Sequence, residues 1–428
     1  MAVSPEVVPG ADTLAPAESV PPLPAPGKLI FGLAFAQFGV MLSLLTPVIV
    51  TLALRVDQIV PKDDRGTALG QVLSLGAVLA LIGNPVFGSL SDRTRSRFGR
   101  RRPWLIGGMA VALVGLLMVA LGGSVPVLMA GWALAQLGGN ASMSAAMASL
   151  PDLVPEQQRG KVSGLIGIMT SLAMVTGTVV ANVFHSTLAL AFVVPALFGV
   201  AGTVCLALVM RDRPAAPDSF EPYSLREFLR SFWVDPRRHP DFAWNFAGRF
   251  LVFVGISCVT SYQVYFLQDR LGYSDSEVSA KVAVGTVIMV VAVIVGSLLG
   301  GVLSDRSGRR KPYVLGASFV LAVGLLLLAL AQSFSFFLLA MAVFGFGQGL
   351  YLSVDVALAA AVLPNPEESA KDLGVLNIGN ALPQSLVPII APALLAIGGG
   401  ENYGALFLFG GIACVLGALA VQFIRSVK

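Results

Sequence analysis

The sequence is poor in charged residues. Only 12% of its 428 residues are Asp, Glu, Lys or Arg, about half of the roughly 25% found in soluble proteins. Hydrophobic residues make up 56%, and the mean hydropathy is +0.81. This composition excludes an ordinary soluble domain and predicts a protein that crosses a lipid bilayer many times. The net charge of +4 does not indicate nucleic-acid binding, because the basic residues fall in short loops between apolar runs.

Residues that bind metals or perform catalysis are also scarce. The three cysteines, Cys205, Cys258 and Cys414, lie inside apolar segments and lack the spacing of metal ligands, so we expect them to pack in the core. His185 and His239 are the only histidines. The sequence offers no nucleotide-binding loop and no hydrolytic triad. It therefore predicts neither an enzyme nor a bound cofactor or metal.

Apolar runs of membrane-spanning length fill most of the chain. A helix needs about 20 mostly apolar residues to cross a bilayer, and charged or turn-forming residues separate twelve such runs. We therefore predict an all-α, polytopic membrane protein. The expected helices are 29–54, 67–90, 104–122, 126–149, 162–185 and 188–210, followed by 242–268, 278–303, 313–331, 334–360, 373–397 and 402–424.

The segments outside these helices have a different composition. Residues 1–27 are rich in Pro and Ala and have few charges, which predicts a disordered cytoplasmic tail. Two six-helix bundles, 28–210 and 242–428, are joined by the longest loop, 211–241. In this loop a capping-box pattern begins at Ser224 and precedes residues of amphipathic spacing, which predicts a helix on the inner membrane surface. A mobile linker is the alternative.

The basic residues set the expected orientation in the membrane. With both termini in the cytoplasm, 22 of the 28 Lys and Arg residues fall in the tails and in the loops that join even-numbered to odd-numbered helices. Because cytoplasmic loops carry an excess of Lys and Arg, we expect a multi-pass protein of the plasma (inner) membrane with both termini inside. One arginine lies within a helix, and five basic residues fall outside: Arg55, Lys62, Arg65, Arg270 and Lys281.

A basic hairpin occurs twice in the chain. Residues 88–108 read GSLSDRTRSRFGRRRPWLIGG, and residues 300–318 read GGVLSDRSGRRKPYVLGAS. Asp92 and Asp305 are equivalent in the two copies, 213 positions apart (305 − 92). The positive-inside rule explains the number of arginines but not the repeated Asp and Gly. The repeat therefore predicts two pseudo-symmetric bundles that arose by duplication.

The hairpin resembles the signature G-x-L-x-D-R-x-G-R-R of the major facilitator superfamily, which is built from two six-helix halves. The second copy fits this signature directly, whereas the first contains an extra Thr94-Arg95-Ser96. That longer form is similar to the glycoside–pentoside–hexuronide cation symporters and the sucrose–proton symporters. The resemblance implies the major facilitator fold and a gate that latches the two halves until the cytoplasmic side opens. The expected gating residues are Gly88, Asp92, Arg93, Gly99, Arg100, Arg101, Gly301, Asp305, Arg306, Gly308, Arg309 and Arg310.

Two charged residues lie deep within the predicted helices. Arg249 and Asp355 belong to different helices, and at 1.5 Å per residue both stand about 10–12 Å from the cytoplasmic face. Ionisable side chains at such a depth are costly and mark function by default, so the two are predicted to pair. Separating the pair would change the proton affinity of the carboxylate and so couple transport to protons. A static pair that knits the second half together is the alternative.

Uncharged polar residues recur at helical spacing on several helices. The first, fourth, seventh and tenth helices resemble those that line the central cavity in this superfamily, and the eleventh carries a further stripe. Each stripe alone suits contacts between helices, but several directed at one cavity favour a hydrogen-bonding solute over a greasy cation. The expected cavity residues are Gln37, Gln136, Asn140, Asn245, Gln348, Tyr351, Asn377, Asn380 and Gln384.

These patterns together predict a secondary transporter that works by alternating access. The first hypothesis is proton-coupled symport of a sugar or glycoside-like solute by a monomer. Sodium coupling is disfavoured, because the helix expected at 67–90 lacks the acidic pair that the similar sodium-coupled melibiose-type symporters carry there. The alternative is a proton-antiport exporter of drugs or metabolites. The helix expected at 162–185 weakens that alternative, since it has no Gly-Pro of the kind found in many antiporters of the superfamily.

Overall fold

The computed structural model describes residues 25–212, 214, 235–362, 369–398 and 400–425, and within these ranges all regular secondary structure is helical. The all-α prediction is thereby confirmed. Most of the predicted N-terminal tail and the predicted linker helix from Ser224 lie outside the described residues. The same is true of the Asn377 side chain and of several neighbouring side chains in its helix.

The helices fall where the apolar runs predicted them. In the first half they are α1 (Gly27–Thr46), η1 (Pro47–Thr51), α2 (Leu52–Asp57), α3 (Arg65–Arg93), α4 (Arg102–Leu121), α5 (Val125–Leu153), α6 (Glu156–Val183) and α7 (Leu188–Val209). In the second half they are α9 (Pro240–Asp269), α10 (Asp275–Ser307), α11 (Lys311–Leu330), α12 (Phe334–Ala361), α13 (Ser369–Leu395) and α14 (Tyr403–Gln422).

Most of these helices satisfy the requirements for crossing a membrane. Among the described residues, 11 segments are long and apolar enough, with α1, η1 and α2 counting as one continuous span. The helix α5 has the length but is not among the 11, and it carries Gln136, Asn140 and several small or hydroxylated residues. Its polar face indicates a position inside the bundle, because polar side chains there are shielded from lipid.

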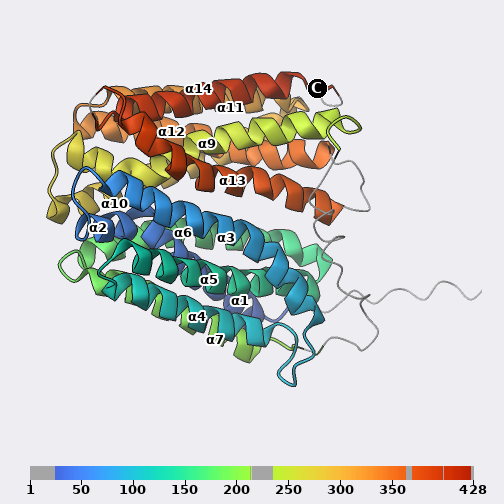
Figure 1. Ribbon diagram of the computed structural model, residues 1–428. Coiled ribbons are helices and arrows are strands. Elements are labelled where there is room, and N and C mark those ends of the chain that lie inside the picture. Colours follow the sequence, from blue (N-terminus) through green and yellow to red (C-terminus); the bar gives the residue numbers. More distant parts are fainter. Residues whose placement is uncertain (1–24, 213, 215–234, 363–368, 399, 426–428) are drawn as a thin grey trace, which may run out of the picture.

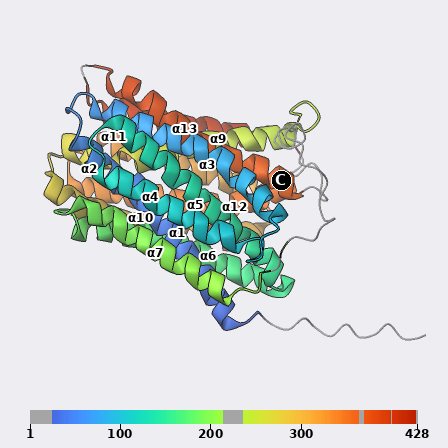
Figure 2. The ribbon, with the colours of Figure 1, turned by 60° about the horizontal axis from the view of Figure 1, so that its bottom comes forward.

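The two halves lie side by side with their helices roughly parallel (Figure 1). They meet along two pairs of helices, α3 with α13 and α6 with α10. Both views place α3 next to α13 at the junction of the halves (Figures 1 and 2). The loop 94–101 lies at the end of the bundle where the described chain stops at residue 425, and we call this the hairpin end. Towards it α3 and α13 diverge in Figure 1.

Prolines interrupt three helices that border the junction of the halves. Pro47 begins the π-helical turn η1, which separates α1 from the short α2. Because proline has no N–H, it removes a helical hydrogen bond at this point, and π turns occur often at functional sites. Pro85 lies inside α3, and α13 contains Pro383, Pro388 and Pro392. The carbonyl of Pro388 accepts a hydrogen bond from the Tyr262 hydroxyl at 3.3 Å.

The two basic hairpins each contain a glycine in the left-handed region of backbone space. Gly99 has φ +102°, and Gly308, which ends α10, has φ +62°. Residues with a Cβ are strained in this region, which explains the repeated glycine. At Gly99 there is a second constraint, because an added Cβ would lie 2.2 Å from Asp212 Oδ2, whereas nothing lies within 4 Å of such an atom at Gly308.

A matched pair of substitutions separates these two constraints. Gly308→Ala is expected to lower stability by about 1–2 kcal/mol, the cost of a left-handed L-residue. Gly99→Ala is expected to cost more, because it adds a collision with Asp212 to the same backbone strain. The check is the melting temperature of both purified variants in one detergent. Equal shifts would show that the close approach of Asp212 adds no cost to the backbone strain at Gly99.

Candidate functional site

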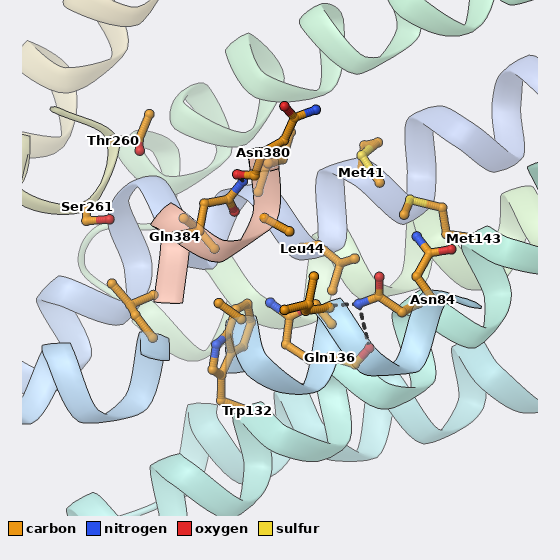
Figure 3. Close-up of a pocket in the computed structure, with 18 of the residues that line it drawn as sticks. Met41, Leu44, Asn84, Trp132, Gln136, Met143, Thr260, Ser261, Asn380 and Gln384 are labelled. Carbon is orange, nitrogen blue, oxygen red and sulfur yellow. Dashed lines mark hydrogen bonds between the residues drawn. The ribbon is translucent and has the colours of Figure 1, made fainter. Parts of the chain in front are cut away.

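A cavity of about 530 Å³ lies between the two halves. Its volume falls within the range of roughly 300–1,000 Å³ that is typical of small-molecule sites. The wall is formed by α1, η1, α3 and α5 of the first half and by α9 and α13 of the second (Figure 3). The lining residues are Met41, Leu44, Leu45, Val48, Leu73, Ala77, Ala80, Leu81, Asn84, Pro85, Trp132, Gln136, Asn140, Met143, Thr260, Ser261, Ile378, Asn380, Ala381 and Gln384.

The polar groups of this wall are uncharged. On α5, Asn140 Nδ2 donates to both the carbonyl and the side-chain oxygen of Gln136, at 2.8 and 3.1 Å. On α3, Asn84 is held by Ser144, whose hydroxyl donates to Asn84 Oδ1 at 2.8 Å. Facing these across the cavity are Asn380 and Gln384 of α13 (Figure 3). Carboxamides on opposite walls present both donors and acceptors to a solute.

An indole forms the apolar floor beside these amides. Trp132 is completely buried and stands one turn before Gln136 on α5, so that both side chains lie on one helix face. The ring packs against Gly76 of α3, where an added Cβ would lie only 2.1 Å from Trp132 Nε1. Glycine at this position therefore sets how far the indole is withdrawn from the cavity.

The structure brings four of the predicted cavity residues to this wall and leaves four of the described ones away from it. Gln136, Asn140, Asn380 and Gln384 line the cavity. Gln37 instead donates to Thr170 of α6 at 3.0 Å, a contact within the first half. The other three belong to the second half and, like the predicted charged pair of Arg249 and Asp355, are not among the lining residues: Asn245, Gln348 and Tyr351.

The predicted ion pair between Arg249 and Asp355 is present. The Asp355 carboxylate forms an ion pair with the Arg249 guanidinium and accepts a hydrogen bond from the Tyr351 hydroxyl at 3.1 Å. Its side chain is 1% exposed and that of Arg249 is 9% exposed. Counted from the opposite end of the bundle, Arg249 stands 20 residues into α9 (269 − 249) and Asn84 stands 19 residues into α3 (84 − 65). The pair therefore lies at about the depth of the cavity wall at Asn84.

The first basic hairpin is organised around one buried arginine. Arg101 is 3% exposed; it contacts Ser91 Oγ at 2.6 Å, pairs with Asp92, and reaches Asp152 Oδ2 at 3.1 Å. Asp212 accepts the backbone N–H of Arg101 at 2.7 Å, at the positive end of α4. In this conformation Asp92 is therefore bound within its own half. The gating function of the two hairpins stays a prediction.

A second charged network lies at the end opposite the hairpins, where it joins the two halves. Lys62 Nζ lies 3.4 Å from Asp269 Oδ1 and 2.6 Å from Glu401 Oε1, both in the second half. The Arg65 guanidinium pairs with Asp269 and, at 2.7 Å, with Asp57. The Tyr403 hydroxyl also donates to Asp269. We call these residues the latch cluster: Asp57, Lys62, Arg65, Asp269, Glu401 and Tyr403.

Neighbouring carboxylates keep the lysine of the latch cluster charged. The hydrogen bond that Lys62 donates to Glu401 raises the pKa of the ammonium above its ordinary value, and the Asp269 carboxylate adds to the effect. A lysine is protonated at neutral pH even without this shift, so the contacts of Lys62 across the halves are ionic at that pH.

Sequence patterns alone did not reveal several of these residues. Trp132 precedes Gln136 and Asn140 at spacings of four and eight, so extending that polar stripe by one turn would have found it. Asn84 was not among the predicted cavity residues. Lys62 and Arg65 were recognised only as basic residues on the outer side. Their partner Asp269 is distant in sequence, and no local pattern joins them.

The chain matches the model of the Major Facilitator Superfamily over residues 29–299 and 282–428. An uncharacterized symporter from Synechocystis sp. is 58% identical over 40 residues, which are 9% of this chain and 7% of that protein. Multidrug resistance protein 3 of Bacillus subtilis is 32% identical over 100 residues, 23% of this chain and 19% of the relative. The chain thus matches less than a fifth of the length of either curated relative.

Solved structures resemble the fold over nearly the whole chain. A mutant of the nucleoside transporter NupG superposes with a TM-score of 0.73 and 14% identity, covering 92% of this chain and 98% of its own. A D-xylose–proton symporter gives a TM-score of 0.69 and 18% identity, covering 94% and 98%. Identities this low show the fold alone, whereas the family match spans nearly all of the described helices. The chain belongs to the Major Facilitator Superfamily and is a membrane transporter, not an enzyme.

Proposed function

We propose that this transporter carries a neutral, hydroxyl-rich solute such as a sugar or glycoside together with a proton. The observation that supports this most strongly is the cavity between the halves, whose described wall has carboxamides and hydroxyls but no charged side chain. A charged substrate would leave its charge unpaired in such a wall, at a large desolvation cost. A polyhydroxylated solute can exchange its hydrogen bonds with water for bonds to the amides.

The Arg249–Asp355 pair is the proposed proton-coupling element. Both side chains are buried in the second half, close to the depth of the cavity wall at Asn84. A rearrangement of α9 against α12 would separate the charges, and a buried carboxylate without its partner binds a proton more readily. The likeness to a D-xylose–proton symporter and the short match to a symporter favour this direction of coupling.

A second candidate is an exporter of apolar drugs or metabolites by proton antiport. It is favoured by the apolar part of the wall, which includes Met41, Met143 and the Trp132 indole. Methionine is flexible and polarizable, so it suits sites that accept several apolar ligands. The match to Multidrug resistance protein 3 of Bacillus subtilis supports this candidate over about a quarter of the chain.

Uptake by proteoliposomes under an imposed pH gradient separates the two candidates. Vesicles with an alkaline interior are expected to accumulate a labelled disaccharide or monosaccharide above its external concentration. This accumulation should stop when a protonophore collapses the pH gradient. A panel of sugars is compared with hydrophobic cations in the same vesicles. If the pH gradient drives movement of the hydrophobic cations and no sugar accumulates, the proposed symport is wrong and export by antiport is the function.

A further inference from the structure

Among the described residues, the ion pairs that join the two halves centre on one carboxylate. Asp269, the last residue of α9, forms ion pairs with Arg65 and Lys62 of the first half. It also accepts a hydrogen bond from the Tyr403 hydroxyl of its own half. Its side chain is only 4% exposed and that of Arg65 only 8%. The outer pair of Lys62 with Glu401 is far more open, at 59% and 48%. Exposed pairs contribute little, so the buried pair of Asp269 with Arg65 dominates the cluster.

Further contacts between the halves close the same end beneath the ion pairs. The Tyr265 hydroxyl of α9 donates to the carbonyl of Ala53 in α2 at 3.1 Å, and the Arg65 guanidinium lies 4.6 Å from the centre of the Tyr265 ring. One turn further along α3, Gly70 packs so closely on α13 that an added Cβ would lie 2.2 Å from the Pro388 carbonyl oxygen. We call the end of the bundle that holds the latch cluster the latched end. Contacts between the halves therefore separate the cavity from the latched end.

One element of the latch cluster, α2, is linked to the rest of its half through an irregular turn. The six-residue α2 carries Ala53 and Asp57 and is joined to α1 through the π turn η1. That turn begins with a proline and includes Val48, which lines the cavity. A short helix beyond an irregular turn can change its direction at low cost, because the turn absorbs the change in backbone angles.

We propose that Asp269 is the hub of a gate at the latched end, and that the gate opens when Asp269 releases Arg65 and Lys62 while α2 pivots at η1. The inference rests on the proposed transport cycle only in requiring alternating access, and does not depend on the solute or the coupling ion. Opening of the gate divides the charged residues of the latch cluster unequally between the two halves. The first half keeps Asp57, Lys62 and Arg65, whereas the second half keeps two carboxylates and Tyr403.

The test measures access to the cavity from the latched end. In a cysteine-free background, Ala77→Cys places a thiol in the cavity wall, and a membrane-impermeant maleimide is added to intact cells, where we expect the latched end to face outward. Asp269→Asn should raise the labelling rate at least about tenfold, since one partner of a buried charge pair has been neutralised. Asp63→Asn is the matched control, because Asp63 is an exposed acid in the adjoining loop 58–64, and it should leave the rate unchanged.

Two further measurements keep the outcome decisive. Labelling of Ala77→Cys in inverted vesicles reports access from the hairpin end, and it should fall in Asp269→Asn as external access rises. Arg65→Gln should reproduce the effect of Asp269→Asn, and the double variant should add little to either. An unchanged external rate in Asp269→Asn, or equal rises in Asp269→Asn and Asp63→Asn, would overturn the gate. Neither result would bear on sugar transport or proton coupling, which proteoliposome uptake tests separately.

Discussion

Asp355→Asn is expected to reduce uptake driven by a pH gradient to the level of protein-free liposomes. The carboxamide keeps the shape of the side chain but cannot take up or release a proton. Exchange of labelled for unlabelled solute at equal pH on both sides should continue, because exchange needs binding and reorientation but no net proton movement. Asp235→Asn is the control, since Asp235 lies on the loop before α9 with 45% of its side chain exposed, and it should transport normally.

The alternative for this pair is a static structural role, and a double variant distinguishes the two. Asp355→Asn alone leaves Arg249 buried without its counter-charge, which is expected to cost about 3–5 kcal/mol of stability. Arg249→Gln/Asp355→Asn removes both charges and should recover much of that loss. If the pair couples protons, the double variant regains stability and retains solute exchange, but it does not regain gradient-driven uptake. Recovery of gradient-driven uptake in the double variant would reduce the pair to a structural contact.

The sequence was sufficient for the architecture because membrane helices obey local rules. Each span must satisfy its own backbone hydrogen bonds and be apolar over about 20 residues, and these properties can be read from consecutive residues. The duplicated hairpin supplied the arrangement in two halves. Even the pairing of Arg249 with Asp355 followed from depth and charge alone, because an isolated charge at that depth would be too costly.

The cavity wall was harder to predict because it depends on helix rotation and tilt. Gln348 and Tyr351 belong to a regular polar stripe with Asp355, but Tyr351 serves the ion pair and neither residue faces the described cavity. Gln37 is likewise turned to Thr170. A stripe shows which residues share a helix face, but it does not show whether that face meets a neighbouring helix or an open space.

The contacts at the latched end illustrate a second reason why parts of the structure could not be predicted from the sequence: they join residues that are far apart in the chain. Arg65 and Asp269 are separated by 204 residues, and both lie at helix ends where a charged residue is unremarkable in a membrane protein. Only the packing of α3 and α9 against α13 gives them a shared environment. Local sequence rules therefore located the helices and the charges, while contacts between the halves depended on the three-dimensional arrangement.

The second large effect is expected from Gly76→Ala, which adds one methyl group behind the indole of Trp132. The new Cβ would lie 2.1 Å from Trp132 Nε1 and 2.4 Å from Cδ1, so the ring has to shift. Because Trp132 is otherwise fully buried and borders the cavity, the unfilled space available to it is the solute site. Overpacking typically costs about 1–3 kcal/mol. If this cost falls on the solute-bound state, solute affinity is weakened about 5- to 150-fold.

Solute affinity and stability are measured together, so that a loss of binding is not mistaken for unfolding. Gly66→Ala is the matched control on the same helix, because its Cβ would meet only Leu395 Cδ1 at an ordinary 3.8 Å. Both substitutions replace glycine by a better helix former, so Gly66→Ala should bind like the wild type and melt at the same or a slightly higher temperature. Trp132→Phe in the Gly76→Ala background should restore part of the lost affinity by making room for the methyl group. A Gly76→Ala protein with unaltered solute affinity would show that the indole does not border the binding site, and would place the solute nearer to the amides of α13.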